Sequence, residues 1–106
     1  MAELVEGRLV LTDGVVPGHL VIEDGFIAQV VREPDNRAAA SGPFVAPGFI
    51  DVHVHGWGGH DATGDAGALT GMAHALLKRG VTSFLPTAPT LPEAEIPRFA
   101  DRVRAW

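Results

Sequence analysis

Two histidines separated by one residue are the strongest chemical feature of the chain. They lie in the segment Asp51–Gly56, DVHVHG, which alternates polar and apolar side chains. If this segment is a strand, Asp51, His53 and His55 share one face, because successive side chains point to opposite faces. The Cα atoms of the two histidines are then roughly 7 Å apart. Neutral imidazole is a common metal ligand, so the pattern predicts that His53 and His55 bind one ion together.

The spacing of the two histidines also fits a second interpretation. Histidines at i and i+2 can be polar residues on a solvated face of a strand, without any metal. Val52 and Val54 favour the metal site, because they predict that the opposite face of the strand is buried. Glycines at positions 56, 58 and 59 would let the backbone turn sharply and leave the metal position open.

The sequence around the histidine pair predicts a strand followed by a helix. Residues 49–55 form the strand, and the helix runs from about residue 65 to residue 79. Asp65 is a suitable N-cap, and Gly80 is a suitable residue just after the helix. One helical face, with spacing i, i+3, i+4, i+7 and i+8, consists of Leu69, Met72, Ala73, Leu76 and Leu77.

Two further elements are predicted after this helix. Residues 81–85 are nearly all apolar or small, which is typical of a strand that is buried on both faces. A last helix has an apolar side formed by Phe99, Val103 and Trp106. Its start is not defined, because Pro97 would break a helix that began at Pro92.

The N-terminal part of the chain predicts short strands at residues 9–11, 19–23 and 26–31. Asp24-Gly25 joins the last two, and this dipeptide is typical of a hairpin whose turn positions both need positive φ. Residues 32–43 are polar or small and contain two prolines, which predicts an irregular connection.

A change of pattern near residues 41–47 predicts two domains, residues 1–46 and residues 47–106. The second has the order strand, helix, strand, helix, which opens a parallel α/β fold. Two parallel strands cannot form a stable domain, and their apolar side chains need partners that these residues do not supply. We therefore expect the chain to be incomplete. Its exposed strand edges predict self-association as a homo-oligomer.

Composition excludes several classes of function. The 106 residues carry eight scattered Lys and Arg and a formal net charge of −5, which argues against a nucleic-acid partner. No apolar run is long enough to cross a membrane, and the N-terminus lacks the pattern of a signal peptide. The absence of cysteine excludes disulfides and thiolate metal sites. We expect a cytoplasmic protein that binds neither a membrane nor a nucleic acid.

The segment Ala46–Gly56 resembles the first barrel strand of the amidohydrolase superfamily. The resemblance implies a (β/α)8 TIM barrel, here its first two β/α units, preceded by half of a small β-sandwich. Dihydroorotases, hydantoinases, adenine deaminases and imidazolonepropionases share much of this pattern. Two further segments are similar to the N-acetylglucosamine-6-phosphate deacetylase family. Gly56–Asp61 resembles its HGxxGxD loop, and Gly80–Thr87 resembles its G-T-T-S-x-L-P-T strand.

Carried over to this sequence, the resemblance makes His53 and His55 metal ligands. Zn²⁺ is the expected ion, with Fe²⁺, Co²⁺ and Mn²⁺ as alternatives, and the site could hold one ion or two. The family's other ligands, its substrate-binding residues and its catalytic Asp come from later strands, so no catalytic residue is expected here. The implied reaction of the complete enzyme converts N-acetylglucosamine 6-phosphate into glucosamine 6-phosphate and acetate. The isolated chain is expected to be inactive.

Several other polar residues have both a functional and a structural interpretation. His60 and Asp61 lie on the loop beside the metal ligands. They either contact the substrate or order this loop, or they are solvated loop residues. Asp51 is expected to make a structural polar contact rather than to bind metal. His19 and His74 are expected on the surface.

Two alternative functions stay open at this point. The first is another amidohydrolase, which would act on a cyclic amide or a nucleobase; the HGxxGxD-like loop argues against it. The second is a non-catalytic assembly fragment. Metal content separates the two classes, because an assembly fragment need hold no zinc.

Overall fold

The computed structural model describes residues 1–106 and divides them into two compact units, Met1–Pro47 and Gly48–Trp106. The predicted boundary, after residue 46, lies one residue from this division. Each unit has its own sheet and its own buried residues.

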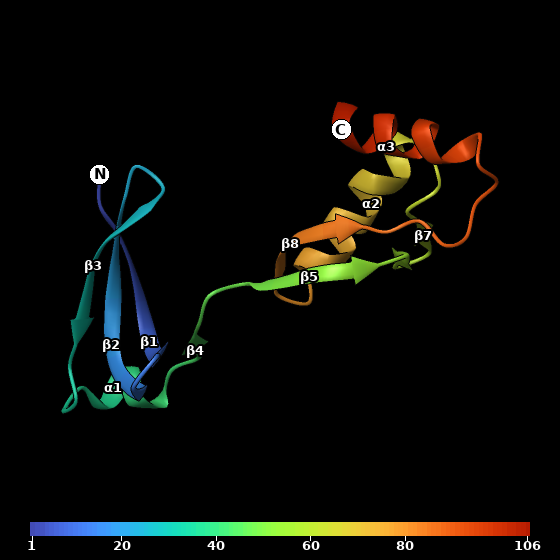
Figure 1. The fold of residues 1–106 in the computed structure, drawn as a ribbon. Helices are drawn as coiled ribbons and strands as arrows, with labels where there is room; N and C mark the ends of the chain where they lie inside the picture. Colours follow the sequence, from blue (N-terminus) through green and yellow to red (C-terminus); the bar gives the residue numbers. More distant parts are fainter. The chain divides into compact units, whose positions relative to one another are not determined.

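The first unit is a four-stranded sheet with the strand order β3-β2-β1-β4 (Figure 1). Its strands are β1 (Glu3–Leu11), β2 (Gly14–Glu23), β3 (Phe26–Arg32) and β4 (Phe44–Val45). The first three form an antiparallel meander, and β4 pairs with β1 in parallel. The strands are longer than predicted, because ladder pairing carries polar residues such as Glu3 and Glu6 that the apolar pattern left out.

The turn between β2 and β3 has the geometry that the sequence predicts. Asp24 and Gly25 have φ of 51° and 80°, so both turn positions lie in the left-handed region that an Asp-Gly dipeptide tolerates. The predicted hairpin is therefore confirmed. The preceding hairpin turns at Thr12 and Asp13, directly before β2.

A short helix, α1 (Arg37–Ser41), lies where an irregular connection was predicted. The side-chain oxygen of Asn36 accepts a hydrogen bond from the Ala39 N–H at 2.9 Å, which caps the first turn. Three consecutive alanines, the best helix formers, follow Arg37. The cap and the alanines outweigh the polar composition on which the prediction rested.

The second unit is built on two parallel strands, β5 (Phe49–Val54) and β8 (Val81–Pro86), joined through helix α2 (Ala66–Leu77). The parallel pairing confirms the predicted strand–helix–strand unit and the α/β class. In Figure 1, α2 packs against this pair of strands, and helix α3 (Glu95–Ala105) follows as the last element.

Helix α2 has the predicted caps and most of the predicted buried face. The Asp65 carboxylate accepts the Ala68 N–H at 2.9 Å, and Gly80 has a φ of 81° just beyond the helix. Leu69, Met72 and Leu76 are buried. Leu77 is 59% exposed, contrary to prediction, because it borders an open hollow that it shares with Val81, Phe84 and Trp106.

The apolar faces of β5 and β8, which were predicted to be buried, are mostly exposed within residues 1–106. This agrees with the expectation that these residues do not supply the partners of the two strands. On β5 only Val54 is buried, whereas Ile50 and Val52 are 69% and 66% exposed. On β8, Leu85 is 58% exposed. Each of these strands has a single partner strand, so no further strand or helix of the chain covers the remaining apolar surface.

The core of the second unit contains Val54, Ala62, Leu69 and Met72, with Phe84, Phe99 and Val103 packed against it. Phe99 and Val103 belong to α3, so the predicted inner side of the last helix is confirmed. This helix begins at Glu95 and contains Pro97 in its first turn, where a backbone N–H has no acceptor within the helix. Among residues 1–106, no helix has both the length and the apolar character that a membrane crossing requires.

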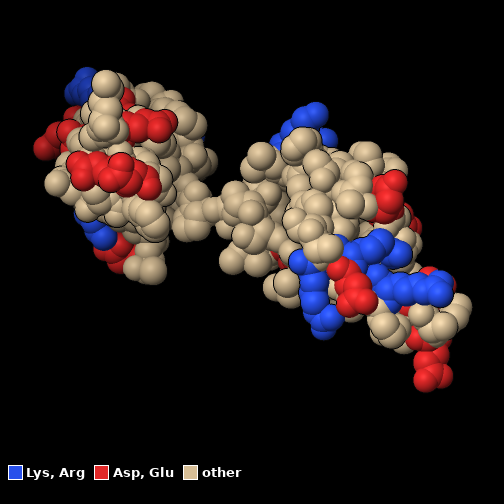
Figure 2. Space-filling view, turned by 90° about the horizontal axis from the view of Figure 1, so that it is seen from above, with Lys and Arg blue, Asp and Glu red and all other residues tan.

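Basic side chains of the second unit pair with acidic ones on helix α3. Figure 2 shows the Lys and Arg side chains of this unit among acidic ones. On α3, Arg98 and Arg104 lie 3.2 Å from Glu95 and Asp101, one turn away on the same helix.

Candidate metal centre

His53 and His55 converge at the C-terminal end of β5. Their Nε2 atoms lie 3.3 Å apart, and their ring planes are nearly perpendicular, at 89°. Both side chains are exposed. The structure therefore brings the two predicted ligands together at one point in space.

The separation of the two nitrogens fits a shared metal ion. Two nitrogens bound to one tetrahedral zinc at about 2.0–2.1 Å lie about 3.3 Å from each other. The observed 3.3 Å equals this value. A third nearby ligand is not supplied, since residues 1–106 contain no group of three or more His, Cys, Asp and Glu that could hold a metal.

The orientation of His55 is set by the chain segment that follows β8. Its Nδ1 atom lies 2.8 Å from the backbone carbonyl oxygen of Thr87. A carbonyl can only accept, so Nδ1 carries the proton and Nε2 keeps its lone pair for an ion. The Thr87 N–H in turn donates to the Val54 carbonyl at 2.9 Å, which extends the β5–β8 pairing to the site.

The role of Thr87 was not predicted from the sequence. It lies 32 residues from His55 and acts through its backbone, so neither its residue type nor its spacing identifies it. The register of β5 against β8 is the information that brings the two residues together.

Asp51 makes a local contact rather than joining the two imidazoles. Its carboxylate oxygen accepts the backbone N–H of His53 at 3.1 Å. This agrees with the structural role predicted for Asp51, and it fixes the backbone from which the His53 ring projects.

A small hairpin follows His55 where a loop was predicted. It consists of β6 (Gly56–Trp57) and β7 (His60–Asp61), joined by Gly58 and Gly59 with φ of 62° and 84°. Both glycines adopt the left-handed conformation that a two-residue hairpin turn needs. The Ala62 N–H then donates to the His55 carbonyl at 2.7 Å, which joins the hairpin to the end of β5.

The two candidate substrate residues of the hairpin have different surroundings. The Asp61 carboxylate accepts the N–H and the hydroxyl of Thr63 at 2.8 and 2.6 Å, and these hydrogen bonds hold the pKa of Asp61 below its usual value. The His60 ring lies against Gly71 of α2. Substrate contact by either residue stays a prediction.

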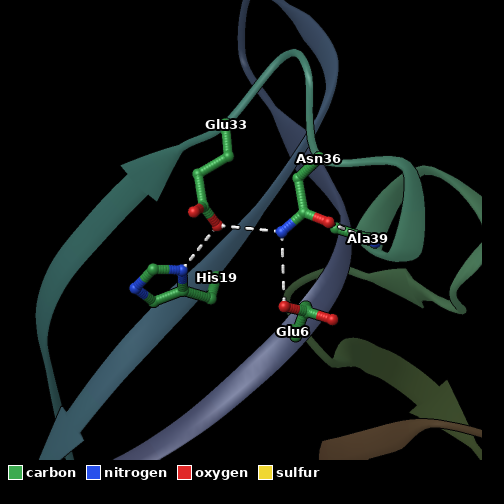
Figure 3. Close-up of polar contacts among 5 residues, drawn as sticks. All are labelled: Glu6, His19, Glu33, Asn36 and Ala39. Atoms are coloured by element: carbon green, nitrogen blue, oxygen red, sulfur yellow. Dashed lines mark hydrogen bonds and ion pairs between the residues drawn. The ribbon is translucent and has the colours of Figure 1, made fainter.

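The histidine of the first unit is part of a closed polar cluster (Figure 3). The Glu33 carboxylate accepts from His19 Nδ1 at 2.8 Å and from the Asn36 amide at 3.3 Å. Asn36 also caps α1, so the cluster joins this helix to the sheet. His19 was predicted to be an ordinary surface residue, but it is partly buried because Glu33 holds it there. His74 is exposed, as predicted.

Comparison with known proteins gives matches that extend over most of the chain. It is 35% identical over 109 residues to N-acetylgalactosamine-6-phosphate deacetylase of Escherichia coli O157:H7, covering 96% of this chain. It is 34% identical over 118 residues to N-acetylglucosamine-6-phosphate deacetylase of Bacillus subtilis (strain 168), covering 100% of this chain. A shorter match, 42% identical over 60 residues and 51% of this chain, is to adenine deaminase of Listeria monocytogenes serotype 4b (strain F2365). No protein-family model matches.

The chain spans only part of each of these relatives. It covers 29% and 30% of the two deacetylases and 10% of the adenine deaminase. The deacetylase matches nevertheless include both the first unit and strand β5, because they cover almost all of the chain. The predicted resemblance to N-acetylglucosamine-6-phosphate deacetylases is therefore confirmed, over the whole chain and over less than a third of such an enzyme.

Proposed function

We propose that the protein containing this chain is a metal-dependent deacetylase of an amino-sugar phosphate. The proposed substrate is N-acetylglucosamine 6-phosphate, and the products are glucosamine 6-phosphate and acetate. The observation that carries the proposal is the 3.3 Å separation of the His53 and His55 Nε2 atoms, in a chain similar throughout to such deacetylases.

His53 and His55 would hold a divalent cation through their Nε2 lone pairs. Such a cation supplies a water of lowered pKa and polarises the amide carbonyl. Zn²⁺ fits nitrogen donors at this separation, and Fe²⁺, Co²⁺ or Mn²⁺ are alternatives, with one or two ions in the complete site. The Thr87 carbonyl keeps His55 in the tautomer that leaves Nε2 free. Further ligands, the catalytic acid–base group and the groups that bind the sugar phosphate would come from outside residues 1–106.

We also propose that the two units are parts of larger domains. Residues 1–46 would be half of a β-sandwich, since the first unit buries only Leu9 and Ala39 among its apolar side chains. An apolar hollow of about 180 Å³ beside Leu9 is open to a covering layer. Residues 47–106 would be the first two β/α units of a (β/α)8 barrel. The parallel β5–β8 pairing supports this, and so does a ligand pair at the C-terminal end of a strand.

In the complete protein, other elements of the barrel would surround the second unit. A barrel needs about 250 residues, so the uncovered apolar faces of β5 and β8 would pack against its other strands and helices. We place the protein in the cytoplasm, as a homo-oligomer, with the sugar phosphate as its small-molecule partner. His60 and Asp61 would lie beside the bound substrate.

Two other substrates have specific support from the comparisons. The similarity to an N-acetylgalactosamine-6-phosphate deacetylase favours the epimeric sugar as a second candidate. The shorter adenine deaminase match favours a nucleobase, and it covers only half of this chain.

The test uses the intact protein with three substrates and a metal analysis. Acetate release is measured with N-acetylglucosamine 6-phosphate and N-acetylgalactosamine 6-phosphate, and ammonia release with adenine. We expect the first substrate to give the highest kcat/KM, and bound metal that is lost in the variant His53→Ala/His55→Ala. His74→Ala, an exposed histidine on α2, is the matched control and keeps both metal and activity.

Each other outcome of this test has a defined meaning. A higher kcat/KM with the epimeric sugar would change the substrate and keep the deacetylase class. Ammonia release without acetate release would replace the deacetylase assignment with a deaminase. A protein that contains no metal and releases neither product would leave the assembly fragment as the function.

A further inference from the structure

The hairpin β6–β7 and the loop after it lie along a row of small residues on α2. The row consists of Ala68, Gly71 and Ala75, which are spaced i, i+3 and i+7 and therefore share one helical face. A Cβ atom added to Gly64 would lie 2.7 Å from the Ala68 Cβ, and one added to Gly58 would lie 2.6 Å from the Ala75 Cβ. The backbones thus approach closely at both ends of the row.

His60 occupies the middle of this row. A Cβ atom added to Gly71 would overlap the His60 ring, meeting Cε1, Nδ1 and Nε2 together. These three ring atoms are nearly equidistant from that Cβ position, so the face of the imidazole, and not its edge, lies against the α2 backbone. A side chain at position 71 would occupy the space of this ring, so the exposed His60 ring would have to leave its present position.

The position of His60 affects the metal-ligand strand through a short chain of contacts. His60 and Asp61 form β7, and the next residue, Ala62, is fully buried and donates its N–H to the His55 carbonyl. A shift of the His60 backbone away from α2 would move Ala62, two residues on, and strain its hydrogen bond to the His55 carbonyl. Thr63 would move as well, together with the hydrogen bonds that orient the Asp61 carboxylate.

We propose that His60 is a positioning residue. Its ring packs against Gly71 and thereby fixes the β6–β7 hairpin beside the His53/His55 pair. The role concerns the packing of the ring and not its nitrogens. This inference deepens the proposed function and rests on it only where metal or substrate is used as the readout. Of the roles left open by the sequence for His60, namely substrate contact, ordering of the loop and a solvated position, it selects ordering of the loop.

The first test compares two glycines of the same helix. Gly71→Ala and Gly67→Ala both improve the intrinsic helix propensity of α2. A Cβ atom at Gly67 would meet only Asp65, with its nearest atom at 3.1 Å, so Gly67→Ala is the matched control. The readout is the indole N–H resonance of Trp57, which lies in β6, in ¹H–¹⁵N spectra of the intact protein. Trp106, which lies outside the hairpin, provides an internal reference.

We expect Gly71→Ala to shift the Trp57 resonance and Gly67→Ala to leave it in place. Equal behaviour of the two variants would overturn the proposal. This readout requires neither metal nor substrate, so a failure here is distinguishable from a failure of the deacetylase assignment.

The second test replaces the His60 ring and so does not depend on the folding of Gly71→Ala. His60→Phe keeps an aromatic ring without nitrogens, whereas His60→Ala removes the ring. We expect His60→Phe to keep the Trp57 resonance and the metal affinity, and His60→Ala to shift the resonance and weaken metal binding by about 10-fold or more. In the double variant His60→Ala/Gly71→Ala, the Trp57 resonance and the metal affinity should equal those of His60→Ala alone. The ring that Gly71→Ala would displace is already absent.

A substrate contact would give the opposite pattern. In that case His60→Phe and His60→Ala would both raise KM, with metal affinity and the Trp57 resonance unchanged. That result would overturn the positioning role.

Discussion

The two units place their histidines in opposite environments. In the first unit, His19 Nδ1 lies 2.8 Å from the Glu33 carboxylate, and Asn36 completes a cluster in which these groups bond to one another. In the second unit, the Nε2 atoms of His53 and His55 face each other at 3.3 Å. The first arrangement is complete without a ligand. The second brings together two nitrogens that need a proton or a cation between them.

This difference separates a stabilising cluster from a candidate binding site. A polar group bonded to its neighbours has little further capacity to bind a ligand. In contrast, His55 uses its only N–H on the Thr87 carbonyl, so its other nitrogen is an acceptor pointed at a second imidazole. Exposure reinforces the contrast, because the His53/His55 pair is open to an incoming ion whereas His19 is partly buried.

Under the proposed function, the largest expected effect is the absence of activity when residues 1–106 are produced alone. Residues 1–106 supply two imidazoles, whereas catalytic zinc usually has three protein ligands and a water. We expect no acetate release from N-acetylglucosamine 6-phosphate by these residues alone, under conditions in which the intact protein is active. Acetate release at a rate near that of the intact protein would show that the second unit is a complete site.

Truncating an apolar side chain in the core of the second unit should lower the free energy of unfolding far more than truncating one at its surface. Leu69→Ala removes a side chain that is 0% exposed in the core, so we expect it to lower the free energy of unfolding by about 2–5 kcal/mol. Leu77→Ala, on the same helix but 59% exposed, should change it by less than about 0.5 kcal/mol. Urea denaturation measures both. A similar loss for Leu77→Ala would mean that a covering element buries this face in the intact protein.

The sequence predicts most elements of both units because their patterns are local. The Asp24-Gly25 turn, the Asp65 cap and the apolar face of α2 each depend on residues within one or two turns of the chain. The short helix α1 was missed because its cap, Asn36, lies in a segment whose prolines and polar residues predict a loop.

The candidate site is predictable only in part, for the same reason. The His53/His55 pair is visible because alternation along one strand puts both rings on one face. The roles of Thr87 and Gly71 cannot be predicted from the sequence. Thr87 contributes a backbone carbonyl from the neighbouring strand, and Gly71 contributes only the absence of a side chain. The exposure of Ile50, Val52 and Leu85 agrees with the expectation that these strands need partners that residues 1–106 do not supply. The sequence pattern alone does not identify those partners.

The backbone of Thr87, rather than its side chain, should control metal binding in the second unit. Thr87→Pro removes the N–H that bonds to Val54 and should displace the carbonyl that orients His55. We expect a loss of about 10- to 100-fold in metal affinity, measured by competition with a chelator. Thr87→Val keeps the backbone and loses only the hydroxyl contact to the Leu85 carbonyl, so it should bind metal as the parent does. Equal losses in both variants would assign the effect to the hydroxyl.

The smallest expected effect is a pH dependence in the first unit. The hydrogen bond from His19, and then that from Asn36, hold the pKa of Glu33 below its ordinary value of 4.5. A carboxyl whose pKa is lower in the folded than in the unfolded chain stabilises the fold above the unfolded pKa, and this contribution is lost as the pH falls through the folded pKa. The loss should therefore begin near pH 4.5 and continue below it.

Glu33→Gln removes this titration and should flatten the acid side of the stability profile of the first unit. Glu93→Gln, a change at an exposed residue without a side-chain hydrogen bond in the second unit, is the control. A ¹³C titration of the Glu33 carboxyl measures the same shift directly. A Glu33 midpoint at or above pH 4.5 would mean that the contacts to His19 and Asn36 do not form in solution. The histidine of the first unit would then not be held in a hydrogen-bonded cluster, and the difference from the His53/His55 pair would disappear.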